Sequence, residues 1–467
     1  MATLTFYGAT AGVTGSSYLL KTSNATILLD FGLFQGSREE ELANSEPLPF
    51  NVADIDAIVL SHAHLDHSGR LPVLVAQGYK GPIYTTRTSR ELIEVLLKDS
   101  AAIQEKDIEW ENKRRQRAGK EEITPLYRLK EVMQTLELCR GLDYHQRVEI
   151  AAGIEVNFLD AGHILGSAIV ELYIREGEQE KKLVFSGDLG NSQAALLKDP
   201  ETVSEADILL LESTYGDRNH RSMDETLDEF EAIIQESSLY GGNVLIPSFA
   251  VGRTQEIIFR LGELYHQGKV GHQAIYLDSP MAIAVTEIYQ RYQNLYNAQD
   301  RATIQSGSQQ QSLHDFLPIL RYSVTTEESM ALNRISSGAI IIAGSGMCNG
   351  GRIRHHFKHN LWRRKTHVVF VGYQAEGTPG RALVEGAKTF KVAGEEIAVK
   401  AQIHTLGGFS AHAGQAQLIN WLTTFKEPKP RLYLVHGETS AKNVFRSALQ
   451  QHGWSALIPT SGETVVF

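Results

Sequence analysis

Three histidines and an aspartate lie within the short segment His62-Ala63-His64-Leu65-Asp66-His67. Side chains so close together would repel one another once the imidazoles were protonated, yet neutral imidazole and carboxylate are ligands that suit Zn²⁺. A metal site is therefore the most economical interpretation of this segment. The alternative is a polar loop that happens to be rich in histidine.

The residues before this segment predict how the fold presents it. Ala57-Ile58-Val59-Leu60 has the length and β-branching of a buried strand, and Gly69 and Pro72 interrupt the chain beyond. We therefore expect the histidines on a tight loop at the carboxyl end of a strand. Asp30 ends an earlier predicted strand, and a carboxylate there can orient the imidazoles of the loop.

Other polar residues repeat this placement at the ends of predicted strands. His163 lies in a glycine-flanked turn, and Asp188 directly follows Gly187 after the apolar run 183–185. Together with the histidine loop they would complete a two-metal site. Three more such residues occur further along the chain, namely Glu212, His412 and His436.

Strand and helix patterns divide the chain into three segments. Short predicted strands at 4–6, 18–20 and 26–29 favour an antiparallel or mixed sheet in a first domain, residues 1–213. From 214 to 385 strands and helices alternate, which is typical of a parallel sheet covered by helices. We assign 386–467, beginning with a strand near 399–404, back to the sheet of the first domain.

Capping patterns predict helices from Thr88 to about Arg117 and from Ser222 to about Ser238.

Composition narrows the classes of protein. The 467 residues are 42% hydrophobic, with no signal peptide and no membrane-length apolar run, so we expect a cytoplasmic location and no membrane association. Only two cysteines are present, so any metal must be held by histidine and carboxylate.

Charge argues mildly against a large nonspecific nucleic-acid footprint, because the formal net charge is −10. Two local basic clusters occur nevertheless, at 113–117 and at 355–365. Both are compatible with solvated helix faces, and for the first cluster we favour that interpretation.

Taken together, these motifs resemble those of the metallo-β-lactamase superfamily and, more narrowly, of the β-CASP nucleases, which include bacterial and archaeal RNases and the nuclease subunit of mRNA 3′-end processing. Asp30, the segment 62–67, His163 and Asp188 match the four superfamily motifs in order. The β-CASP motifs A, B and C are matched by Glu212, His412 and His436. At motif C the chain has histidine and in this resembles the RNA-processing members of the family, whereas the DNA-repair members have valine there.

The resemblance implies an α/β fold, a metallo-β-lactamase αββα sandwich with an inserted parallel-sheet β-CASP domain. It also implies two Zn²⁺ ions, with Mn²⁺ as a possible substitute. His62, His64 and His163 would hold one ion and Asp66, His67 and His436 the other, with Asp188 bridging. Such a pair of ions lowers the pKa of a shared water and clamps a phosphate.

By the same resemblance we expect hydrolysis of single-stranded RNA, endonucleolytic, with 3′-hydroxyl and 5′-phosphate ends. The catalytic residues would be Asp66, His412 as the acid that protonates the leaving oxygen, and Glu212 as the carboxylate that orients His412. A DNA nuclease, a small-molecule metallohydrolase and a catalytically idle scaffold are the alternatives. A homodimer is compatible with the sequence but not required by it.

Substrate contacts are expected on two glycine-containing turns between strand and helix. The turn 344–352 resembles a cradle of backbone amides for a phosphate, although such turns also occur for packing alone. The turn 248–253 also contains a glycine and also lies between a predicted strand and a predicted helix. The residues expected to touch RNA are Arg253, Ser345, Asn349, Arg352 and, next to motif B, Ser410.

Overall fold

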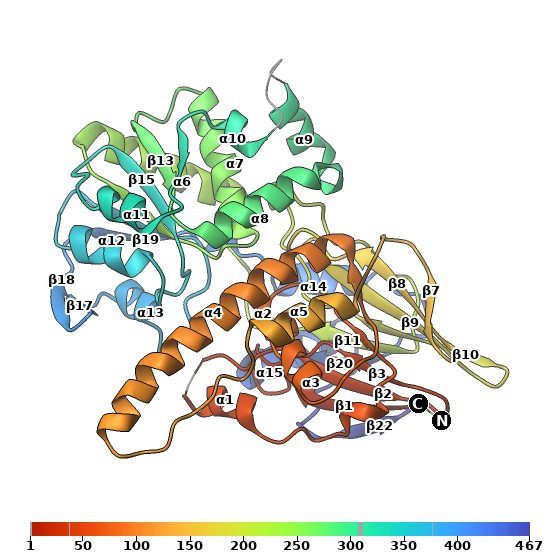
Figure 1. The fold of residues 1–467 in the computed structure, drawn as a ribbon. Coiled ribbons are helices and arrows are strands. Elements are labelled where there is room, and N and C mark those ends of the chain that lie inside the picture. The colour runs from red at the N-terminus through yellow and green to blue at the C-terminus, as the bar shows by residue number, and fades with distance from the viewer. Residues whose placement is uncertain (1, 37, 307–311, 376) are drawn as a thin grey trace. The chain divides into compact units, whose positions relative to one another are not determined.

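Two compact units make up the chain. This computed structural model describes residues 2–36, 38–306, 312–375 and 377–467. The first unit contains Met1–Ser192, Asp199–Asn219 and His412–Phe467, and the second contains Gln193–Lys198 and His220–Ala411. Figure 1 shows both units, and the elements labelled in it carry the labels used below.

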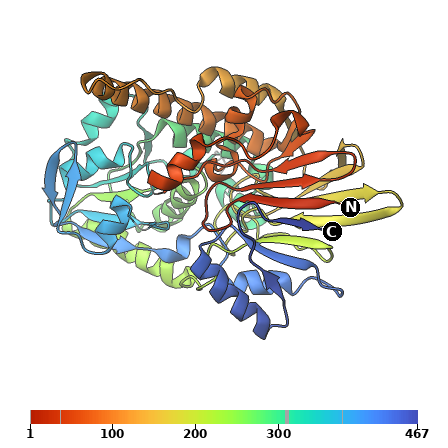
Figure 2. The same ribbon diagram turned by 90° about the horizontal axis from the view of Figure 1, so that it is seen from below.

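Two seven-stranded sheets form the centre of the first unit. The first sheet joins the two ends of the chain, because β22 pairs antiparallel with β1 (Figure 2). Its strands in spatial order are β22 (Thr464–Val466), β1 (Thr3–Gly8), β2 (Ser17–Lys21), β3 (Thr26–Leu29), β4 (Ala57–Val59), β5 (Ile83–Thr86) and β6 (Cys139–Leu142). The three strands predicted near the N-terminus are confirmed.

The second sheet contributes most of the strand ends on which the candidate ligands lie. Strands β10, β11 and β20 run parallel to one another, and β9 runs antiparallel to β10. The strands in spatial order are β21 (Ala456–Leu457), β20 (Arg431–Val435), β11 (Ile208–Glu212), β10 (Gln179–Phe185), β9 (Ala168–Glu176), β8 (Ile154–Asp160) and β7 (Val148–Ala151).

Large apolar side chains fill the space between these two sheets. The ring centroids of Tyr18 and Phe185 lie 5.3 Å apart, and those of Phe6 and Tyr433 lie 5.2 Å apart. Each pair joins one sheet to the other. Side chains alternate between buried and partly exposed along β1, as expected for a strand with one face on a core. The interior thus holds the two sheets face to face.

Helices cover the outer faces of the sandwich. Helix α4 (Arg87–Arg117) lies beside β5 and β6, and α5 (Leu129–Leu138) packs on α3 and α4. The second sheet packs its outer face on α14 and α15 through Trp421 and Phe445. The result is an αββα sandwich, as predicted. The helical segments of this unit are α1 (Arg38–Leu42), η1 (Ala43–Ser45), η2 (Val52–Asp54), α2 (Leu65–Ser68), α3 (Leu71–Ala76), α4 (Arg87–Arg117), α5 (Leu129–Leu138), α14 (Gln415–Leu422) and α15 (Thr439–Gln451).

The second unit is built on a six-stranded sheet in which every neighbouring pair is parallel. This agrees with the predicted α/β alternation. In spatial order its strands are β14 (Leu320–Tyr322), β13 (Ala274–Leu277), β15 (Ala339–Ala343), β12 (Val244–Pro247), β16 (His367–Phe370) and β19 (Gln402–Thr405). A separate hairpin consists of β17 (Thr389–Val392) and β18 (Glu395–Ala398).

Helices connect the strands of this sheet, and buried residues of α12 pack directly on it through Ile353 and Phe357. The helical segments are α6 (Met223–Tyr240), α7 (Arg253–His266), α8 (Pro280–Arg291), η3 (Gln293–Leu295), α9 (Ala298–Gln305), α10 (Leu313–Phe316), α11 (Thr326–Leu332), α12 (Ile353–Asn360), α13 (Pro379–Val384) and η4 (Gly407–Phe409).

The boundaries of the units differ from those expected at 213/214 and 385/386. Strand β19 was expected in the sheet of the first domain, but it pairs with β16, with Val368 opposite Ile403. The chain therefore returns to the first unit only at His412. An apolar strand pattern shows that a strand forms, whereas its partner is set by contacts distant in sequence.

Two helix starts test the capping predictions. Helix α6 begins after Ser222, whose hydroxyl accepts a hydrogen bond from the Glu225 amide at 3.2 Å, as predicted. Helix α4 begins earlier than predicted, because Thr86 and not Thr88 caps it and accepts from the Ser89 amide at 3.1 Å.

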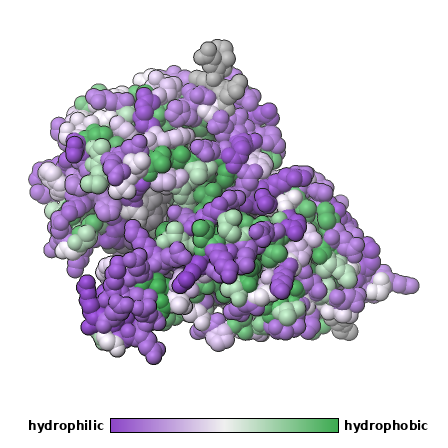
Figure 3. All heavy atoms as spheres, in the orientation of Figure 1, coloured by the Kyte–Doolittle hydropathy of each residue, from purple (hydrophilic) through white to green (hydrophobic). Residues whose placement is uncertain are grey.

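Across the described ranges no helix is both long and apolar enough to cross a membrane. Hydrophilic and apolar side chains are intermingled on the face shown in Figure 3.

Excision of residues 220–411, replaced by a short Gly/Ser linker, is expected to leave a folded first unit. The cut ends are already adjacent, because the Gln415 amide donates to the Arg218 carbonyl at 3.0 Å. Removal of 214–385 is the matched comparison, and it should give a less stable product because β19 remains without its sheet. Thermal unfolding followed by circular dichroism measures both proteins. Equal cooperativity and Tm would contradict the boundary at His412.

Candidate metal centre

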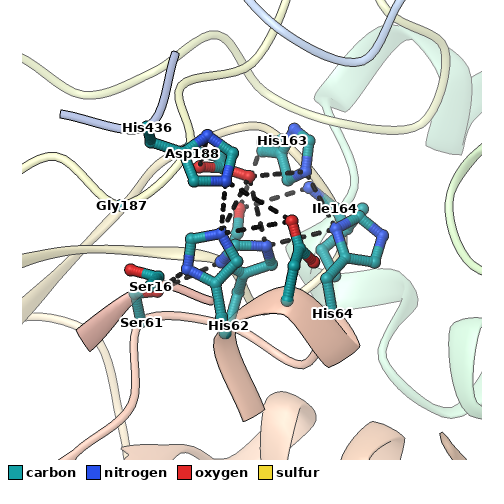
Figure 4. Close-up of polar contacts among 12 residues, drawn as sticks. Ser16, Ser61, His62, His64, His163, Ile164, Gly187, Asp188 and His436 are labelled. Atoms are coloured by element: carbon teal, nitrogen blue, oxygen red, sulfur yellow. Dashed lines mark hydrogen bonds and ion pairs between the residues drawn. The ribbon is translucent and has the colours of Figure 1, made fainter. Parts of the chain in front are cut away.

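The candidate ligands predicted from the sequence come together in the first unit. They lie on the segments that follow the carboxyl ends of β4, β8, β10 and β20, and after β4 the ligands Asp66 and His67 lie on the short helix α2. Figure 4 shows imidazoles from several loops turned toward Asp188. The residues that form the two clusters are His62, His64, Asp66, His67, His163, Asp188 and His436.

Left-handed backbone turns these loops sharply at the strand ends. Gly187 has φ +55°, and a Cβ atom there would lie 2.7 Å from the Ala168 carbonyl oxygen, so glycine is required. Asp30 and His436 have φ 53° and 47°, values that residues other than glycine adopt uncommonly. Such strain is tolerated where the surrounding structure holds a side chain in a particular direction.

His62, His64 and His163 form the first cluster with Asp188. His64 Nδ1 lies 3.1 Å from both His62 Nε2 and His163 Nε2. Asp188 Oδ2 lies 3.5 Å from His62 Nε2 and 3.6 Å from His163 Nε2. These separations fit one tetrahedral ion, because Zn–N bonds of about 2.0–2.1 Å place neighbouring ligand atoms about 3.3 Å apart.

Asp66, His67 and His436 form the second cluster with the same aspartate. His67 Nε2 lies 3.1 Å from His436 Nε2 and 3.3 Å from Asp188 Oδ2. His436 Nε2 lies 3.4 Å from Asp66 Oδ2. Asp188 therefore belongs to both clusters.

The surroundings of Asp188 fit a bound cation. Both of its carboxylate oxygens are buried, and neither accepts a hydrogen bond within the described part of the chain. A buried carboxylate without such partners is costly unless a positive charge balances it. The donors around it are imidazole nitrogens and carboxylate oxygens, the set that Zn²⁺ or Mn²⁺ accepts. These residues could thus hold one divalent ion in each cluster.

The two clusters differ in the protonation states that their surroundings favour. Burial lowers the pKa of His64 to about 4 and that of His62 well below its ordinary value, so both imidazoles are neutral. Burial alone would raise the pKa of Asp188, but the surrounding imidazoles hold it well below its ordinary value. Burial likewise opposes protonation of His67, yet Asp188 and the other nearby carboxylates raise its pKa. Negative charge around His67 is thus in excess, and a metal cation would balance it.

Asp30 orients the imidazole of His67 in the second cluster. Its Oδ2 atom lies 2.6 Å from His67 Nδ1, and its Oδ1 atom accepts a hydrogen bond from the Ser61 amide at 2.7 Å. The opposite ring nitrogen of His67 consequently faces Asp188. A carboxylate in this position fixes both the tautomer and the direction of a ligating imidazole.

Comparisons with protein families match three successive segments of the chain. Residues 10–236 match the metallo-beta-lactamase superfamily, and residues 254–383 match the Beta-Casp domain. Residues 396–459 match the Zn-dependent metallo-hydrolase RNA specificity domain.

Among curated relatives, Ribonuclease TTHA0252 of Thermus thermophilus is 39% identical over 460 residues, which cover 98% of each chain. The chain belongs to the β-CASP branch of the metallo-β-lactamase superfamily. It is a metal-dependent nuclease of that branch. Transcription termination factor FttA of Methanocaldococcus jannaschii is 32% identical over 94% of this chain and 67% of its own length. A protein of unknown function from Enterococcus faecalis V583 shares the fold, with 13% identity, full coverage and a TM-score of 0.55.

Glu212 and His412, at the positions of β-CASP motifs A and B, form a pair beside the clusters. His412 Nδ1 lies 3.2 Å from Glu212 Oε1 and 4.0 Å from Asp188 Oδ2. Glu212 is fully buried and is fixed by the amides of Leu189 and Thr214, at 2.8 and 3.2 Å. Burial lowers the pKa of His412, but the charges of Glu212 and Asp188 outweigh it and raise the pKa to about 9.

Two hydroxyl residues in this β-CASP centre were not predicted. Ser61 Oγ donates to Asp30 at 2.8 Å and lies 3.1 Å from His62 Nδ1. Thr214 Oγ1 lies 3.1 Å from His436 Nδ1. Ser61 follows β4 and lies next to His62, and Thr214 follows β11 and lies two residues after Glu212. Each is therefore close in sequence to a predicted site residue. A search of the neighbours of candidate ligands for hydroxyl groups would have found both.

The glycine-rich turn lies between β15 and α12, where the sequence predicted it. Within the turn, Ser345 Oγ accepts from the Gly350 amide at 3.2 Å, and the Ile353 amide donates to the Gly344 carbonyl at 3.0 Å. The side chain of Asn349 is exposed. These hydrogen bonds close the turn on itself, which is the packing role left open by the sequence.

The predicted substrate arginines are both engaged within the second unit. Arg253 is 5% exposed and forms an ion pair with Glu256. Arg352 donates to buried Asp278 at 2.7 Å. Neither guanidinium is therefore a free cation for phosphate in this structure. Ser410 lies in the same unit just after η4 and is 6% exposed.

Replacement of Asp30 by Asn is expected to weaken metal binding about 10- to 100-fold, because it removes the charge that orients His67. Metal competition with a chromogenic chelator measures the affinity. Asp56→Asn is the control, since Asp56 accepts one amide hydrogen bond, from Thr26 at 2.8 Å, and is not one of the cluster residues. Equal affinity of Asp30→Asn and wild type would show that Asp30 has only a structural role.

Proposed function

We propose that this β-CASP protein is a ribonuclease that uses two Zn²⁺ ions, or Mn²⁺ in their place, to cleave single-stranded RNA internally. The observation that carries the proposal is the position of the Glu212–His412 pair next to two clusters that share Asp188. A metal centre alone would serve many hydrolases. An adjacent protonated imidazole adds the acid that a poor alkoxide leaving group requires.

In this proposal each residue of the clusters acts as a ligand. His62, His64 and His163 would hold one ion, Asp66, His67 and His436 the other, and Asp188 both. The bound ions would supply an activated water and neutralise charge on the phosphate. Asp66 thereby contributes to catalysis as a ligand, and Asp30 keeps His67 in place.

His412 acts on the leaving oxygen. Glu212 faces its Nδ1 atom, which leaves Nε2 as the ring nitrogen that can give a proton to substrate. Attack of water on phosphorus with departure of the protonated 3′-oxygen leaves a 3′-hydroxyl and a 5′-phosphate. The raised pKa of His412 keeps its proton available at neutral pH.

RNA is favoured as the substrate by the relatives and by motif C. One relative, 39% identical over 98% of each chain, is named as a ribonuclease, and residues 396–459 match an RNA specificity domain. The histidine at motif C, His436, lies in the second cluster. A DNA nuclease with the same centre is the nearest alternative, whereas a small-molecule hydrolase leaves the inserted unit without a role. A cytoplasmic location and a homodimer stay predictions from the sequence.

Substrate contacts beyond the centre are proposed at Ser345, Asn349 and Ser410. In this proposal Arg253 and Arg352 shape the second unit through Glu256 and Asp278 and would reach phosphate only if these ion pairs opened.

Cleavage of matched 5′-labelled RNA and DNA oligonucleotides by metal-quantified protein tests the proposed function. We expect internal cuts in RNA, with 3′-hydroxyl ends, and loss of at least about 100-fold in rate for His67→Ala because a ligand is removed. Cleavage of DNA alone would favour the alternative nuclease. No cleavage of either strand by protein with two bound ions would refute the proposal.

His412→Ala should retain its metals but lower kcat about 10²- to 10⁴-fold, the usual contribution of a general acid. Because the acid must be protonated, kcat should fall as pH rises through the pKa near 9. Glu212→Gln removes the charge that raises this pKa and should move the alkaline limb of the kcat profile to lower pH. His452→Ala, which changes an exposed histidine at the end of α15, is the control. Unchanged kcat in His412→Ala would exclude the assignment.

A further inference from the structure

We infer that the second unit carries a separate surface for single-stranded RNA at the amino ends of its strands. This inference rests on the proposed function and extends it to a second region of the same substrate. The surface, which we call the amino-edge surface, consists of Arg334, Trp362, Arg363, Arg364, Lys365 and Lys400.

Three segments bring these residues together. The turn 361–366 connects α12 to β16, and the amides of Lys400 and Ala401, just before β19, donate to the Leu361 carbonyl at 2.8 and 2.9 Å. The guanidinium of Arg363 donates to the Ile335 carbonyl at 3.2 Å, next to Arg334. The five cations are therefore neighbours in space although they lie up to 66 positions apart in the sequence (Arg334 to Lys400).

The cations of the amino-edge surface differ in their ion pairs from those of the other basic cluster. None of the five cations forms an ion pair with a carboxylate in the residues that the structure describes. The basic cluster on α4 differs, because Lys113 pairs with Glu109 at 2.7 Å and Arg114 with Glu111 at 3.2 Å. In a chain of net charge −10, a group of cations without carboxylate partners is the kind of local feature that attracts phosphates.

An exposed aromatic ring lies among these cations. Trp362 is 52% exposed, and the Arg363 guanidinium lies 5.3 Å from its ring centroid. Tyr240, at the end of α6, is 69% exposed. The chain returns near this turn two residues later, since a Cβ at Gly242 would lie 1.8 Å from the Lys365 carbonyl oxygen. Aromatic rings beside such cations stack bases while the cations bind the backbone, which is the pattern of single-strand binding.

The amino-edge surface would bind a different part of the RNA from the glycine-rich turn. The turn 344–352 follows the carboxyl end of β15, whereas the amino-edge surface precedes β16 and β19. With four to five residues per strand, the two edges are about 13–16 Å apart. The surface should consequently matter for long RNA more than for short RNA.

Binding of labelled single-stranded RNA to the full chain tests this inference, with EDTA present to prevent hydrolysis. For a 30-nucleotide RNA at low salt, Arg364→Ala/Lys365→Ala should raise Kd about 3- to 10-fold. It should also reduce the slope of log K against log salt by about 1.4, because each phosphate that the protein no longer neutralises lowers the slope by about 0.7. Trp362→Ala should weaken binding, and Trp362→Phe should restore much of it because phenylalanine still stacks.

Lys113→Ala/Arg115→Ala is the matched control, since it removes the same charge from the α4 cluster. Equal effects of the two double variants, or an unchanged Kd for Arg364→Ala/Lys365→Ala, would overturn the inference and would direct attention to an acidic protein as the partner of this surface. Cleavage of the same RNA by metal-loaded wild type is measured in parallel. If metal-loaded wild type does not cleave this RNA, the proposed function is refuted. If wild type cleaves it and the variant binds long RNA more weakly, the result concerns the amino-edge surface.

Discussion

The buried carboxylate of Asp188 is the constraint on which the rest of the first unit depends. It receives no hydrogen bond from the described residues, and imidazoles from three loops of the chain approach it at 3.3–3.6 Å. A charge in that position is tolerable only with cations beside it. The loops must then be held rigidly by other means, which explains the left-handed turns and the hydroxyl groups of Ser61 and Thr214. These groups hold the ligands in position even when no cation balances the negative charge of Asp188.

The same constraint explains why the two clusters differ in charge. The first has three imidazoles and shares one carboxylate, whereas the second also has Asp66 and is supported by Asp30. Excess negative charge is thus concentrated around His67, and the positive member of the Glu212–His412 pair lies 4.0 Å from Asp188. The imidazole proposed as the proton donor thus lies at the edge of a group of carboxylates.

Much of this arrangement could be predicted because strand ends are local features of the sequence. An apolar run followed by His62, by Asp188 or by Glu212 already places the side chain at a sheet edge. Partners distant in sequence could not be predicted in the same way. Asp278, 74 positions away, forms an ion pair with Arg352 and so engages the guanidinium of a candidate phosphate ligand. The sheet to which β19 belongs was missed for the same reason, since its residues specify a strand but not the neighbour that binds it.

The order of residues along the chain also has a consequence for biosynthesis. His412 and His436 both follow the inserted unit, and β22, which pairs with the first strand, comes later still. A ribosome must therefore translate the whole inserted unit before His412 and His436 can join the residues that precede it. Until then the nascent chain has no complete centre while it is attached to the RNA that encodes it. If the protein is the proposed ribonuclease, its messenger would meet a complete centre only after the inserted unit has been translated.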